Sequence, residues 1–287
     1  MLPDNTAKKL RLIDCLLDKK ASELPSTGVL GRELLGSFAG LEDAAIQKRL
    51  LSSLIEKYVL LERRVDQLLK NTLPESVAEE IKSSGIYPPR PFDVTILFMD
   101  CAGFTKLTEK IPAEMLISFL HELFSGIDLK IEACGGTKVK TIGDAYMAVF
   151  GAPEAQPDHA VHAVNAALDA LEFIESFNRK MPEPFHLRIG IHSGMVMGGV
   201  VGRDRMQFDV FGDNVNIASR FESSGEKSRI NVSESTWRLS QEWFTWEERG
   251  EIPLKNKAPM RAFFVTGRSK NRSIRRLERG GVHAYED

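Results

Sequence analysis

Two stretches of the sequence decide the fold. The first is FDVTILFMD at residues 92–100, an almost continuously apolar run that ends on a carboxylate. The second is TKVKTIGDAYMAVFG at residues 137–151, in which Gly143 and Asp144 form a dipeptide typical of a two-residue hairpin turn. The two stretches predict three strands, with Asp100 at the end of the first and Asp144 at the turn between the other two.

Two segments with helical periodicity complete the predicted core. AEMLISFLHELFSGIDLKIEA, at residues 113–133, follows the first strand, and residues 158–180 form a second long helix that leads to the strand HLRIGIHSG at 186–194. The order β-α-β-β-α-β predicts an α+β fold with a ferredoxin-like core. Shorter elements are expected after it: a strand near residues 206–211, a helix at 213–224, and strands near 229–233 and 261–267.

The segment before this core is predicted to be helical. Apolar residues recur from Leu51 to Leu68 with alternating spacings of three and four, which is the pattern of a coiled-coil seam. A helix packed on its own domain would give the same pattern, and both interpretations stay open because the run is shorter than three heptads. Pro74 ends the seam, and a short helix then leads to a PPRP linker at residues 88–91.

Composition narrows the class of protein. The 38 basic and 40 acidic residues nearly balance, which argues against a general nucleic-acid or membrane-surface binder. No run approaches the roughly 18 apolar residues of a membrane span, so we expect no integral membrane segment and a cytoplasmic location. The cysteines Cys15, Cys101 and Cys134 are odd in number and lack metal-ligand spacing, which favours free thiols.

Asp100 and Asp144 are the first candidates for chemistry. In a ferredoxin-like sheet their strands are neighbours, so the two carboxylates can converge and hold a pair of divalent cations for phosphoryl displacement. Such oxygen ligands suit Mg²⁺ bound to a nucleoside triphosphate. The alternative is that Asp144 only forms a turn and Asp100 only ends a strand. The segment CAGFT after Asp100 offers backbone N–H groups that could cradle phosphate.

Four strings carry a resemblance to a known family. They are FMDCAGFTKLTEK, KVKTIGDAYMAVFGAP, RIGIHSGMVMGGVVG and FDVFGDNVNIASRFES, which begin at residues 98, 138, 188 and 208. In order and spacing they resemble the catalytic domain of a class III nucleotidyl cyclase, over roughly residues 92–266. The resemblance implies an adenylate cyclase that converts ATP to 3′,5′-cyclic AMP and pyrophosphate with two divalent cations, Mg²⁺ or Mn²⁺.

The resemblance also implies metal and phosphate ligands. Asp100 and Asp144 match the metal-binding aspartates, and Cys101 stands where a backbone carbonyl also contacts metal. Lys255 matches a lysine that binds the terminal phosphates, although Lys257 is a competing candidate. The phosphate-cradling residues implied after the first aspartate are Gly103, Phe104 and Thr105.

Two further pairs are implied to bind the nucleoside and the reacting phosphate. Lys140 and Asp209 match the residues that read the base. A lysine only donates hydrogen bonds and an ionised aspartate only accepts them, so together they complement N1 and the amino group of adenine. Guanylate-forming relatives typically carry Glu and Cys there, which makes ATP the favoured substrate. Asn216 and Arg220, four apart on one helix face, match the residues that orient the ribose and stabilise the transition state.

The family pattern implies a symmetric homodimer with two equivalent sites, because the metal aspartates of one copy face the other residues of its partner. The chain then divides into a small, regulatory helical region (1–50), a coiled-coil helix and linker (51–90), the catalytic domain (91–266) and a basic tail (267–287). Three alternatives remain: a guanylate cyclase, a catalytically silent cyclase-like regulator, and an RNA-binding ferredoxin-like domain. The last would need exposed aromatic residues and a basic surface, and neither is apparent.

Overall fold

The computed structural model describes residues 44–103, 112–179, 184–202, 205–254 and 257–269. The chain divides between Leu69 and Lys70 into two compact units. Helix α3 spans Ala44–Lys70, so all but its last residue belongs to the first unit, and it leaves apolar side chains such as Tyr58 and Leu68 exposed. Among the residues that the structure describes, no helix has the length and apolar character needed to cross a bilayer. The coiled coil and the division into four regions stay predictions.

The second unit contains an eight-stranded sheet in its described residues, with the order β2-β3-β1-β4-β6-β8-β7 and with β5 paired to β4. Within it, β2-β3-β1-β4 is the antiparallel ferredoxin-like order, so the predicted fold class is confirmed. The strands are β1 (Arg90–Ala102), β2 (Thr137–Ile142), β3 (Ala145–Phe150), β4 (His186–Val201), β5 (Gln207–Phe211), β6 (Arg229–Ser233), β7 (Phe244–Ile252) and β8 (Met260–Arg268).

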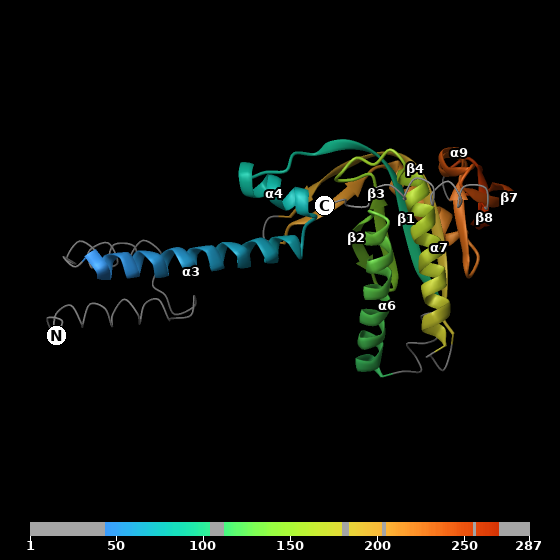
Figure 1. Cartoon of the computed structure of the whole chain (residues 1–287). Coiled ribbons are helices and arrows are strands. Elements are labelled where there is room, and N and C mark those ends of the chain that lie inside the picture. The colour runs from blue at the N-terminus through green and yellow to red at the C-terminus, as the bar shows by residue number, and fades with distance from the viewer. Residues whose placement is uncertain (1–43, 104–111, 180–183, 203–204, 255–256, 270–287) are drawn as a thin grey trace, which may run out of the picture. The chain divides into compact units, whose positions relative to one another are not determined.

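Helices α6 (Ala113–Ala133) and α7 (His159–Asn178) lie side by side against the sheet (Figure 1). The main hydrophobic core lies beneath them and includes Leu97, Met99 and Cys101 of β1. Successive side chains of a strand point to opposite faces, so Asp100 lies on the face opposite α6 and α7. The other helices among the described residues of this unit are α4 (Glu75–Ser84), α8 (Asp213–Ser223) and α9 (Glu234–Ser240).

Helix α8 reaches its position because β4 carries a glycine beneath it. A Cβ atom at Gly190 would lie 1.9 Å from the backbone nitrogen of Glu222, so only glycine allows the helix to approach this closely. The helix buries Ile217 and Phe221 and leaves Asn216 exposed. One face of α8 is thereby fixed to the sheet, and the opposite side is open for function.

Candidate active site

Asp100 and Asp144 come together where strand β1 ends and β3 begins. Asp100 is the Cα partner of Ala145, the residue that follows Asp144. Burial raises the pKa of Asp144, and the negative charge of Asp100 raises it further, against the opposing effect of Arg188. The two aspartates therefore form a close, partly buried pair of acids, as the sequence predicts, whose combined negative charge favours a bound cation.

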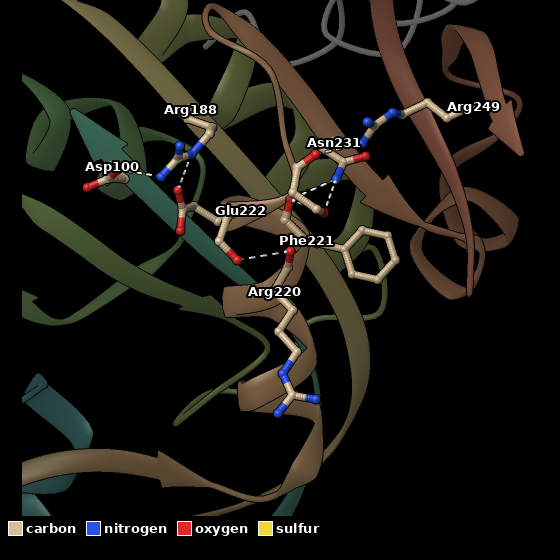
Figure 2. A network of polar contacts seen from close by, with 9 residues as sticks. Asp100, Arg188, Arg220, Phe221, Glu222, Asn231 and Arg249 are labelled. Atoms are coloured by element: carbon tan, nitrogen blue, oxygen red, sulfur yellow. Dashed lines mark hydrogen bonds and ion pairs between the residues drawn. The ribbon is translucent and has the colours of Figure 1, made fainter. Parts of the chain in front are cut away.

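Arg188 and Glu222 join this pair and were not predicted from the sequence. Arg188 donates from Nη2 to Oδ2 of Asp100 at 2.8 Å and from Nε to Oε1 of Glu222 at 2.6 Å (Figure 2). Burial raises the pKa of the Glu222 carboxyl, and Arg188 opposes that rise. The signal that could have found Arg188 is the pairing of β1 with β4, which sets it directly opposite Asp100.

Cys101 offers only its backbone to this site. Its side chain lies in the core under α6 and α7 and is 3% exposed. Burial, with repulsion from the Asp144 and Asp100 carboxylates, raises the pKa of its thiol to about 12. Because its side chain faces the core, only the backbone of Cys101 could take part in a site beside Asp100.

Lys140 and Asp209 form a second pair. Nζ of Lys140 lies 2.5 Å from Oδ2 of Asp209, and the other carboxylate oxygen accepts from the backbone N–H of Val210 at 2.9 Å. Gln207, which the sequence did not single out, donates from Nε2 to the carbonyl of Val139 at 3.1 Å. Strand β5 is therefore tied to β2 by two contacts, that of Lys140 with Asp209 and that of Gln207 with Val139.

Asn216 and Arg220 share one side of α8, four residues apart. Glu222, two residues after Arg220, faces Arg188 and Asp100. A step of two residues turns an α-helix by roughly 200°, and Figure 2 shows the Arg220 guanidinium pointing away from these residues. Nη1 of Arg220 is buried and has no hydrogen-bond partner in the described part of the chain. Arg220 is thus directed away from its own chain's aspartate pair.

The residues predicted to bind phosphate are described only in part. Gly103, just after β1, has a φ of 94°, a left-handed conformation that favours glycine. Phe104, Thr105 and Lys255 lie outside the described residues. Lys257, the competing candidate for the terminal phosphates, pairs with Asp213 of α8, with Nζ 2.5 Å from Oδ2.

The structure therefore gathers the predicted residues into three groups. Among the described residues no cluster of three metal-ligating side chains occurs, so the acidic pair stands as two carboxylates. Mg²⁺ is commonly held by one or two carboxylates together with substrate phosphates and water, and the Asp100 and Asp144 pair fits that pattern.

Known proteins resemble this chain. A family model for the adenylate and guanylate cyclase catalytic domain matches residues 86–267, more than half of the chain. An adenylate cyclase of Mycobacterium bovis is 36% identical over 207 residues, which cover 71% of this chain and 47% of that protein. Retinal guanylyl cyclase 2 of Bos taurus is 37% identical over 271 residues, which cover 92% of this chain and 23% of that protein.

A solved structure agrees with these matches. The guanylate cyclase domain of RhGC from Catenaria anguillulae, in complex with GTP, is 36% identical with a TM-score of 0.61, and the match covers 63% of this chain and 100% of that one. The match spans less than half the length of each of these two curated relatives. The family match and the shared sheet show that the chain belongs to the class III nucleotidyl cyclases, as an adenylate and guanylate cyclase catalytic domain.

Proposed function

We propose that this chain is an adenylate cyclase that converts ATP to 3′,5′-cyclic AMP and pyrophosphate. The contact between Lys140 and Asp209 carries the choice of base. Adenine presents an acceptor at N1 and a donor at its amino group, which match a lysine donor and an aspartate acceptor. Guanine presents a donor at N1 and an acceptor at O6. The lysine donor would then face a second donor, and the aspartate acceptor a second acceptor.

Overall similarity does not decide between the two nucleotides. The adenylate cyclase and the guanylyl cyclase are 36% and 37% identical to this chain. Residues that touch the base must carry the decision, because a site built to hydrogen-bond one edge rejects a base whose groups it leaves unpaired. Gln207 supports the proposal by holding β5 and β2 in a fixed relation beside the pair.

Asp100, Asp144 and the carbonyl of Cys101 would hold two divalent cations, Mg²⁺ or Mn²⁺. Bound cations there would neutralise charge on the attacking and leaving oxygens of an in-line displacement. The carboxylate pair is suited to this task because it is partly buried and carries more negative charge than Arg188 alone can balance. Lys255, or Lys257 in its place, would bind the terminal phosphates.

Asn216 and Arg220 would act on the ribose and the α-phosphate. In the proposed reaction the 3′ oxygen bonds to the α-phosphorus, the bond to the bridging oxygen of pyrophosphate breaks, and the 3′ hydroxyl loses its proton. Negative charge grows on the α-phosphate oxygens as this happens. Arg220 offers a fixed fork of donors to that charge. Its Nη1 has no hydrogen-bond partner among the described residues, which supports a role with a partner from outside the chain.

A homodimer would bring the two half-sites together. Arg220 points away from Asp100 of its own chain (Figure 2), so a second copy can supply the aspartates it serves. The ribbon formed by β4 and β5 leaves Met197 and Phe211, which are Cα partners, 45% and 47% exposed. Exposed apolar side chains beside the base-reading pair suit a surface that a second copy covers.

Helix α3 would also pair with its copy in the homodimer. Leu51, Tyr58, Leu61 and Leu68 lie on its predicted seam and are each more than half exposed. A parallel two-stranded coiled coil would bury them. The regulatory role predicted for residues 1–50 would act through this coiled coil.

Incubating the purified protein with ATP or GTP and Mg²⁺ or Mn²⁺ tests the proposal. Cyclic AMP and pyrophosphate should form from ATP, with much less cyclic GMP from GTP, and Asp144→Ala should abolish both while leaving the unfolding curve intact. Preference for GTP would make the chain a guanylate cyclase. No turnover of either nucleotide would make it a silent regulatory module.

A further inference from the structure

Tyr87 occupies an unusual place in the segment between α4 and β1. It is 9% exposed, while its neighbour Ile86 is 67% exposed and the two prolines after it lie at the surface. Burial raises the pKa of its phenol. A segment of five residues thus inserts one aromatic ring into the domain and leaves the rest outside.

The Tyr87 ring meets strand β5. Its centroid lies 6.0 Å from that of Phe208, with an angle of 85° between the ring planes, an edge-to-face contact. Phe208 stands between Gln207 and Asp209, so its side chain projects from the face of β5 opposite those two residues. Tyr87 therefore supports from behind the strand that presents Asp209 to Lys140.

Arg90 connects the same ring to helix α4. Its guanidinium carbon lies 4.4 Å from the centroid of Tyr87, and its Nη2 forms an ion pair with Glu80 of α4. We define the Tyr87 clamp as Glu80, Arg90, Tyr87 and Phe208. It links the helix that precedes the catalytic domain to the strand that carries the base-reading aspartate.

Strand β5 depends on such support because its backbone pairs only with β4 among the described strands. Strand β4 makes room for it at Gly198, where a Cβ atom would lie 3.4 Å from the Phe208 ring and 2.7 Å from that of Phe92. Any movement of Phe208 therefore shifts the Asp209 carboxylate relative to Lys140. A hydrogen bond weakens steeply with small errors of distance and angle.

We propose that Tyr87 is a positioning residue for base recognition, and that through the Tyr87 clamp the placement of α4 governs how strictly the site selects its nucleotide. This rests on the proposed role of Asp209. If Tyr87 only filled space in the core, its loss would lower stability and activity with both nucleotides alike. If it positions Asp209, its loss changes the ratio of activity with ATP to activity with GTP.

The test compares three variants. Tyr87→Leu keeps an apolar side chain but removes the ring, and Tyr87→Phe keeps the ring. Trp237→Leu is the matched control, because it removes a ring whose centroid lies 4.7 Å from that of Phe263 on β8. Tyr87→Leu should raise KM for ATP and narrow the ratio of kcat/KM for ATP over GTP by roughly two- to tenfold, the worth of an edge-to-face pair. Tyr87→Phe and Trp237→Leu should keep the wild-type ratio.

Binding of 3′-deoxyATP and 3′-deoxyGTP, which lack the attacking hydroxyl, gives the same comparison without turnover. The loss of preference for the adenine nucleotide that Tyr87→Leu causes should disappear in an Asp209→Ala background. If Tyr87 acts only through Asp209, removing Asp209 leaves it no effect on this preference. An unchanged ratio in Tyr87→Leu, or an equal loss in the Asp209→Ala background, would overturn the inference. Failure of the proposed function appears separately, as a wild-type chain that prefers GTP or turns over neither nucleotide.

Discussion

Arg188 bridges Asp100 and Glu222, with Nη2 2.8 Å from the first carboxylate and Nε 2.6 Å from the second. The guanidinium is partly buried between two acids, and Asp144 adds a third negative charge nearby, since it also raises the pKa of Glu222. Without divalent cations, Arg188 is the positive charge that this acidic cluster contacts directly among the described residues. Arg188 and any bound cations therefore neutralise the same carboxylates.

We expect Arg188→Met to lower the free energy of unfolding by about 2 kcal/mol, because it leaves two partly buried carboxylates without their donor. Millimolar Mg²⁺ should restore more stability to this variant than it adds to the wild type, since it replaces the missing charge. Urea unfolding with and without Mg²⁺ measures both. Arg229→Met, which removes the ion pair with Glu247, is the control. An equal effect of Mg²⁺ on both variants would contradict the metal site.

Exchange of the base-reading pair should change the substrate. Lys140→Glu with Asp209→Cys replaces a donor by an acceptor and an acceptor by a weak donor, so kcat/KM for ATP should fall by at least about tenfold and cyclic GMP should become detectable. Lys138→Met removes the other lysine of β2, which pairs with Asp128 at 2.9 Å, and should keep the wild-type ratio. An undiminished preference for ATP in the double variant would show that the base is read elsewhere.

The burial of His192 predicts how the free energy of unfolding depends on pH. Asn214 donates to the carbonyl of Met195, so its oxygen accepts from Nε2 of His192 at 2.9 Å. Nδ1 lies 2.8 Å from the Ser233 hydroxyl, which donates to it when the ring is neutral. The ring is 3% exposed. Burial lowers the pKa of His192 below its ordinary 6.5, against opposing effects of Asn214 and Asp213, and burial lowers that of His159 likewise.

The unfolded chain therefore binds more protons than the folded chain just below pH 6.5, and the free energy of unfolding should fall as pH drops through that window. His192→Gln should flatten the dependence by up to about 1.4 kcal/mol per pH unit. The exposed His121 provides a control substitution, His121→Gln. Equal slopes in all three proteins would show that His192 is not buried as a neutral ring.

Much of the fold could be predicted because strong local patterns coincide with real elements. The run before Asp100 and the turn at Gly143 and Asp144 correspond to β1, β2 and β3. Strand β4 is longer than predicted. Its glycines suggested a strand end, but they lie within the strand, where side chains from other elements approach closely. A Cβ atom at Gly194 would lie 2.6 Å from Nδ2 of Asn214. Such a requirement depends on residues distant in sequence, so the local pattern did not reveal it.

Strand β7 was missed for a different reason. Its sequence, FTWEERGEI, exposes several charged residues at the edge of the sheet and contains Gly250 at a φ of 75° beside a register shift. Edge strands of this kind lack the alternation that identifies a half-buried strand. Arg188 and Glu222 were missed in the site because their significance arises only when β4 pairs with β1 and α8 packs over Gly190.

Complementation tests the shared site most directly. An Asp144→Ala chain keeps Asn216 and Arg220, whereas an Arg220→Ala chain keeps both aspartates. Random exchange places half of the chains in mixed dimers with one intact site of two, so activity should return to about a quarter of the wild-type value per chain. Mixing Asp144→Ala with Asp100→Ala, two lesions of the same half-site, should restore nothing. Failure of the first mixture to recover, with subunit exchange shown independently, would contradict a site built between two copies.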